Sequence, residues 1–139
     1  MTRRPATPGV GKRLLGLIYE ALLLVAVILP AGIIAAAFSQ IANPEYTRPI
    51  TQAFVVVACA SYFAWQWHRS GQTLPMKTWH MRIETADGAS VTLPRALLRL
   101  ALATTGYLLL GISVLWAFVD RDRQFLHDRL AGTRLVKTE

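Results

Sequence analysis

Glu20 is the residue of this sequence that most directly suggests chemistry, because it is a lone acid inside a long hydrophobic run. No other charged residue lies between Leu14 and Asn43, and the nearest cation is Arg13, seven residues earlier. Seven residues are two turns of an α-helix, so Arg13 and Glu20 share one face about 10 Å apart along the axis. An acid inside a membrane helix is costly, and we therefore treat Glu20 as a candidate functional residue.

Two interpretations of Glu20 remain open at this point. In the functional interpretation the carboxylate handles a proton or a cation. In the structural one it ties helices together through hydrogen bonds or an ion pair with a basic residue of the tail. Gly16 lies one turn before Glu20 and leaves room on that face for a neighbouring helix or a water molecule.

Asp128 is the second candidate, in a segment near the C-terminus that also carries apolar residues at helical spacing. Its functional role is pairing with a basic residue such as Arg13 or Arg99, and the alternative is an ordinary solvated acid on a helix surface. The separations of the histidines match no metal or haem ligand pattern, so we expect no metal and no cofactor. The sequence contains no phosphate loop, zinc-protease helix or nucleophile elbow, so an enzyme is not expected.

The composition places the chain among membrane proteins. Hydrophobic residues make up 53% of its 139 residues and charged residues only 17%, and the charges flank long uncharged runs. The net charge of +7 is therefore better explained by lipid headgroups and by the positive-inside rule than by nucleic acid. We expect a lipid bilayer as the main partner and no nucleic acid.

The hydrophobic pattern predicts an all-α membrane protein with about three transmembrane helices. These are expected at residues 14–38, 50–68 and 96–119, each close to one bilayer thickness. Alternating apolar residues around a turn signal predict a short β-hairpin over 77–93, in the loop before the third helix. An apolar stripe predicts an amphipathic helix over 121–131, lying along the membrane surface. The whole chain, 1–139, is expected to form a single domain.

The distribution of basic residues predicts the orientation. The N-terminal tail and the second loop are rich in Arg and Lys, so both are expected in the cytoplasm, with the first loop outside. Three plain crossings place the C-terminal tail outside. A turn back near Gly106 or Gly111 would instead keep that tail inside, close to Arg13.

The chain resembles the RDD family of small bacterial integral membrane proteins over nearly its whole length. The resemblance lies in "FVDRDRQFLHDRLAGTRLV" near the C-terminus, "GQTLPMKTWHMRIETADG" in the middle, and "RALLRL". The family is named for an arginine and two aspartates, which fall here on Arg13, Glu20 and Asp128. The first aspartate is thus a glutamate in this chain, and Pro75-Met76 replaces the Gly-Lys that is usual after "GQTL".

The resemblance implies a multi-pass protein of the bacterial inner (cytoplasmic) membrane that takes part in transport of an ion or small solute. It also implies that Arg13, Glu20 and Asp128 form a polar binding cluster. Arg99 is the further basic residue with which Asp128 could pair. Three helices enclose little volume, so transport would need a homo-oligomer. The alternative is a non-transporting module that binds other membrane proteins or assists their assembly.

Overall fold

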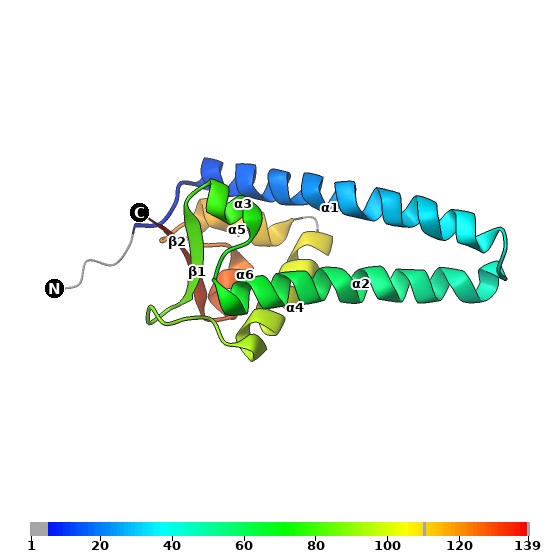
Figure 1. Cartoon of the computed structure of the whole chain (residues 1–139). Coiled ribbons are helices and arrows are strands. Elements are labelled where there is room, and N and C mark those ends of the chain that lie inside the picture. The colour runs from blue at the N-terminus through cyan, green and yellow to red at the C-terminus, as the bar shows by residue number, and fades with distance from the viewer. Residues whose placement is uncertain (1–5, 110, 139) are drawn as a thin grey trace.

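The computed structural model describes residues 6–109 and 111–138, which form a long helical hairpin joined to a compact body (Figure 1). The elements in chain order are α1 (Val10–Ser39), α2 (Pro44–Arg69), α3 (Leu74–Thr78), β1 (Met81–Thr85), α4 (Leu93–Leu108), α5 (Ile112–Val119), α6 (Leu126–Leu130) and β2 (Thr133–Lys137). The fold is predominantly helical, as the sequence predicted, with one small antiparallel sheet.

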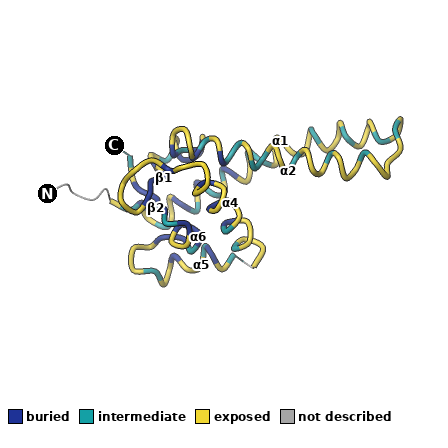
Figure 2. Tube along the Cα trace, turned by 90° about the horizontal axis from the view of Figure 1, so that it is seen from below, coloured by how far each residue is buried: buried dark blue, intermediate teal, exposed yellow. Residues whose placement is uncertain are grey.

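Helices α1 and α2 form the hairpin, and both begin earlier than the sequence predicted. α2 starts at Pro44 rather than at residue 50 because Asn43 caps it, its side chain accepting a hydrogen bond of 3.0 Å from the Glu45 amide. Proline is also favoured in the first turn of a helix, where its missing N–H is no loss. The part of the hairpin farthest from the body leaves apolar side chains such as Ile33 and Phe54 exposed, as lipid contact requires (Figure 2).

The predicted count of three membrane crossings is not confirmed. Within the described residues, α1 is the one helix that is long and apolar enough on its own to cross a bilayer. Helices α4 and α5 meet that description only when they are counted together, and they are bent by 94° at the break between them. The expectation of one continuous helix over 96–119 is therefore wrong.

Glycine explains why the chain can turn between α4 and α5. Gly111, just before α5, has φ +72, a left-handed conformation that costs glycine little. A Cβ on Gly106 would lie 2.5 Å from Cβ of Ser113, so only glycine allows α5 to approach α4 this closely. The turn brings the C-terminal segment back to the end of the molecule where α1 begins. The Lys137 amide there donates a 2.9 Å hydrogen bond to the carbonyl of Ala6, so β2 ends beside the segment that leads into α1 (Figure 1).

The predicted hairpin over 77–93 is also wrong. Strand β1 forms where the alternation predicted a strand, but its partner is β2, which pairs with it from Met81↔Lys137 to Thr85↔Thr133. The turn at Gly88 is present, with φ +91, but the chain beyond it runs into α4 and not into a second strand. Pairing with β2 buries apolar side chains of both strands. An isolated two-stranded hairpin is only marginally stable, so this pairing within the body is the more stable arrangement.

The tail helix is shorter than predicted, and its apolar residues do not form one exposed stripe, because Phe125 is buried whereas Leu130 is exposed. Only Leu126–Leu130 is helical, because the Asp120 carboxylate accepts bonds of 3.2 and 2.8 Å from the amides of Asp122 and Gln124 and so forms a turn. α6 buries His127 and Asp128 against the body.

Where the hairpin meets the body, a hydrophobic core closes the structure (Figure 2). It joins α2, α3, α4 and both strands, and its buried members are Trp67, Met76, Met81, Ile83, Val91, Ala96 and Leu135.

Candidate functional site

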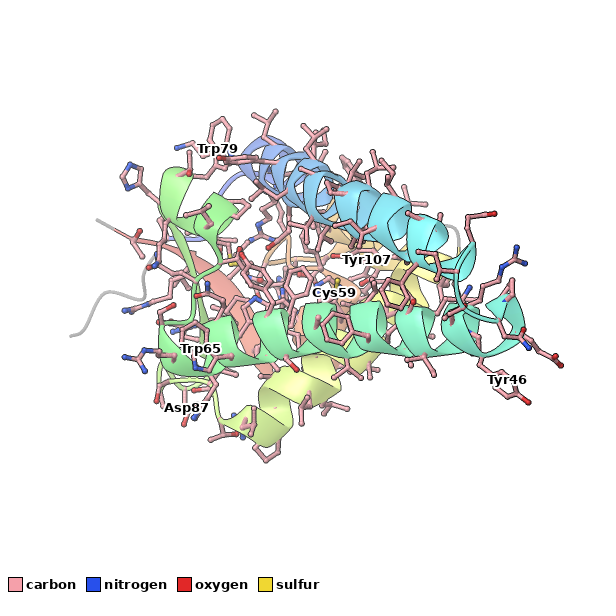
Figure 3. The ribbon with its side chains drawn as sticks, turned by 45° about the vertical axis from the view of Figure 1, so that its right-hand side comes forward. Tyr46, Cys59, Trp65, Trp79, Asp87 and Tyr107 are labelled. Carbon is pink, nitrogen blue, oxygen red and sulfur yellow. The ribbon has the colours of Figure 1, made fainter. Side chains whose placement is uncertain are left out.

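Helix α1 places Arg13 and Glu20 on one face, toward the body. Both are buried, with 1% and 9% of their surface exposed. Gly16 lies between them and permits the close approach of β1, because a Cβ at this position would lie 3.0 Å from the Met81 methyl carbon. Trp79 is the next group to meet that position, and it lies beside the first turns of α1 (Figure 3).

A cavity of about 430 Å³ opens beside this face. Its wall is mainly apolar, with Leu17 and Leu24 from α1, Phe63 from α2, and Leu100 and Leu108 from α4 among its members. The charged and hydroxyl side chains that reach the wall are Arg13, Glu20, Arg99, Thr104 and Tyr107, the last of which is labelled in Figure 3. A mainly apolar cavity of this size with a few polar groups is typical of a small-molecule site.

Arg13 is only partly satisfied by the protein. Its Nη1 donates to the carbonyl of Arg123, and its guanidinium lies 5.5 Å from the centre of the Phe125 ring. Its Nε and Nη2 are buried and have no hydrogen-bond partner among the described residues. A buried unsatisfied donor on a charged group is costly, so these two atoms need an explanation.

Glu20 is in a similar position on the same wall. Its Oε1 is buried without a hydrogen-bond partner in the described part of the chain. The Thr73 hydroxyl lies close enough to the carboxylate to act on it as a hydrogen-bond donor, and the Arg99 charge acts on it without forming an ion pair within 4 Å. The protein therefore leaves a buried acceptor as well as two buried donors beside the cavity.

Arg99 and Asp128, by contrast, form a buried ion pair through one carboxylate oxygen, while the other, Oδ2, has no hydrogen-bond partner among the described residues. Arg99 Nε donates to Asp128 Oδ1 at 2.6 Å, and its guanidinium lies 4.2 Å from the centre of the Trp67 ring. Burial raises the pKa of the Asp128 carboxyl, but the charge and hydrogen bond of Arg99 outweigh this and hold that pKa below its usual value. Asp128 is therefore ionised at neutral pH, and it lies behind the cavity wall as the anchor of Arg99.

His127 joins this pair to α5. Arg99 Nη2 lies 3.3 Å from His127 Nε2, and a guanidinium only donates, so Nε2 accepts and the neutral ring carries its proton on Nδ1. Nδ1 then donates to Ser113 Oγ at 2.6 Å. Burial is the main reason that the pKa of His127 is lowered to about 4. The negative charge of Asp128 raises this pKa, and the positive charge of Arg99 lowers it.

The set of Ser113, His127 and Asp128 resembles a hydrolase triad in residue types only. Ser113 is 1% exposed and packs on Gly106, which leaves no space for a substrate at Oγ. We interpret the set as the attachment of α6 to α5.

The structure thus separates the four residues chosen from the sequence into two groups. Arg13 and Glu20 line the cavity with unpartnered atoms, and Arg99 lines it too but is bonded to Asp128 behind the wall. Asp128 acts electrostatically on Arg13 without contacting it. Sequence reasoning did not select Trp67, whose ring lies against Arg99, or the buried Thr73.

Among the residues that the structure describes, no group of three or more His, Cys, Asp or Glu side chains is placed to hold a metal ion.

The class of protein follows from these features. Helix α1 is able to cross a bilayer, apolar side chains are exposed along the hairpin, and the buried charges gather at one end, as in a helical membrane protein. The chain belongs to the RDD family, whose model matches residues 7–132. No curated protein and no solved structure matches it.

Proposed function

We propose that this protein binds an ion or small solute at the Arg13–Glu20 side of the cavity and takes part in its transport across the membrane. One observation carries the proposal: three atoms of these two charged side chains are buried beside a 430 Å³ cavity without hydrogen-bond partners among the described residues. Burying such atoms costs several kcal/mol in a purely structural site, and a bound solute would recover that cost.

The two residues have complementary roles in this proposal. Arg13 offers donors to an anionic group, and Glu20 offers an acceptor to a cation, a proton or an N–H group. Arg99 and Asp128 serve as the rigid part of the wall, because their charges already satisfy each other at 2.6 Å. Asp128 is therefore a positioning residue rather than a ligand-binding one.

Transport by this chain would involve a homo-oligomer in the bacterial inner membrane, with the N-terminus in the cytoplasm. The basic N-terminal tail supports that orientation. The apolar side chains that α1, α2 and α5 leave exposed offer surfaces for a second copy as well as for lipid.

The test is exchange in vesicles that hold the purified protein, a Na⁺ or K⁺ gradient and an entrapped pH dye. We expect Glu20→Gln to abolish pH-dependent ion flux while the protein remains folded. Glu45→Gln is the matched control, since this acid is exposed at the start of α2, and its flux should equal that of the parent. Equal flux in both variants would refute the role of Glu20, as would absence of flux in the parent protein.

The second candidate is a module that binds other membrane proteins and does not transport. It is favoured by the hairpin of α1 and α2, which extends beyond the body with apolar side chains on its surface (Figure 2). It predicts a stoichiometric membrane-protein partner after extraction in a mild detergent. A clean monomer or homo-oligomer would count against it.

A further inference from the structure

The unpartnered atoms of Arg13 have a geometry that selects their ligand. Nε and Nη2 lie on the same edge of the guanidinium and form the fork that binds a carboxylate or phosphate through two parallel bonds. The remaining nitrogen, Nη1, is held by the Arg123 carbonyl, which fixes the plane of the group. Arg13 is 1% exposed and is one of the residues that line the cavity, so its fork lies beside the cavity and away from bulk solvent.

The unpartnered carboxylate oxygen of Glu20, Oε1, requires a hydrogen-bond donor and not an anion. It lies about 10 Å further along the axis of α1, and no ion pair joins it to Arg13. A bare anion on Arg13 would also meet the negative charge of Glu20 on the same wall. A ligand that carries an anion for Arg13 and an N–H donor for Glu20 satisfies both residues and leaves the cavity without net excess charge.

The rest of the cavity requires an apolar group. Beyond the charged residues it is lined by Leu17, Leu24, Leu100 and Leu108. Helix α1 packs on α2 and α3, and α4 packs on α2, α5 and α6. Over the described residues α1 and α4 do not pack closely on each other, although both line the cavity. The cavity therefore lies between two helices whose outer faces expose apolar side chains such as Ile18 and Leu97 to the bilayer.

We propose that the cavity binds an amphiphile of the membrane whose head carries a phosphate and a primary ammonium, with its hydrocarbon chain between α1 and α4. The phosphate occupies the Nε–Nη2 fork of Arg13, and the ammonium donates to Glu20 Oε1. Arg13 lies in the first turns of α1, at the end where the charged groups of the chain gather, which is the depth of a lipid headgroup. This proposal rests on the proposed function, because it names the ligand of the same site.

The test is binding of a monoacyl phosphoethanolamine to the purified full chain in detergent, measured by native mass spectrometry. The parent protein should bind it at least about tenfold more tightly than a monoacyl phosphocholine, whose trimethylammonium group has no N–H to donate. It should also bind it far more tightly than free phosphoethanolamine, which has the same head without a chain. Equal binding of the two amphiphiles, or equal binding of the free head, would overturn the proposal.

Two variants locate the contacts. Arg13→Lys keeps a donor for the Arg123 carbonyl but removes the fork, so binding should weaken about tenfold. Arg48→Lys, the same change at an exposed position of α2, should leave binding unchanged. Glu20→Gln should reduce the preference for phosphoethanolamine over phosphocholine, a ratio that does not depend on how much of the variant is folded. An unchanged ratio, or an effect of Arg13→Lys no larger than that of Arg48→Lys, would overturn the proposal.

Failure of this proposal and failure of the proposed function give different results. Selective binding of the amphiphile in a protein without ion flux supports the ligand assignment and refutes transport. Flux that requires Glu20, in a protein without selectivity for the head, refutes the ligand assignment and leaves transport in place.

Discussion

Replacing Asp128 with Asn tests the ion pair that supports the cavity wall. Asp128 is fully buried, and its Oδ1 lies 2.6 Å from Arg99 Nε. The asparagine keeps an acceptor for Arg99 but removes the charge, which leaves a guanidinium buried without its counter-ion. Breaking a buried pair from one side typically costs about 3–5 kcal/mol, and the retained hydrogen bond places our expectation at about 3 kcal/mol.

The assay is unfolding in mixed micelles with increasing SDS, followed by tryptophan fluorescence. Trp67 reports on the site because Arg99 lies 4.2 Å from the centre of its ring. Asp122→Asn is the matched control, since the side chain of Asp122 is 65% exposed where it pairs with Arg129. Exposed pairs contribute about 0–1 kcal/mol, so this variant should unfold nearly as the parent does.

A double variant separates the cost of an orphaned charge from the cost of lost packing. Replacing Arg99 with Met and Asp128 with Leu removes both charges, so it should recover most of the stability lost in Asp128→Asn. The reasoning is refuted if Asp128→Asn is no less stable than Asp122→Asn, or if the double variant is less stable than Asp128→Asn.

Three other predictions follow from the body of the protein. Gly106→Ala should destabilise the fold by about 1–3 kcal/mol through collision with Ser113, whereas Gly32→Ala, with open space around it, should not; both are measured by the same unfolding assay. Because the pKa of His127 is about 4 in the folded protein and 6.5 in the unfolded chain, the unfolded state binds the proton first as the pH falls. Stability should therefore drop by about 3 kcal/mol between pH 6.5 and 4, and His127→Gln should lose that dependence; an equal slope in this variant would contradict the assignment. Truncation after Gly132 removes β2 and uncovers β1, so the shortened chain should lose cooperative unfolding; a transition as sharp as that of the full chain would contradict it.

The sequence predicted the two helices of the hairpin, although not where they begin, because their signals are local. The uncharged run of α1 and the apolar run of α2 identify these helices without knowledge of the rest of the chain. Strand β1 was also found from its alternation. Its partner was not, because alternation shows that a strand exists but not which distant segment pairs with it. The break between α4 and α5 had a signal in Gly106 and Gly111, yet a glycine in an apolar run is equally compatible with a continuous membrane helix.

The site was predicted in part for the same reason. A charge in an apolar run is visible in the sequence, so Arg13 and Glu20 were found directly. The partner of Asp128 depended on the turn between α4 and α5, so the sequence left Arg13 and Arg99 as alternatives. The structure selects Arg99. The role of His127 was not predicted, because its burial arises only when α6 packs on α5.

The claim that the cavity is the working site is tested most directly by filling it. Leu17 lines the cavity, whereas Leu15, two residues earlier on the same helix, is 47% exposed. The measurement is ion flux in vesicles for Leu17→Trp and Leu15→Trp at equal protein content. We predict that the tryptophan at position 17 abolishes flux and that the one at position 15 leaves it at the level of the parent. Equal flux in the two variants would contradict the account.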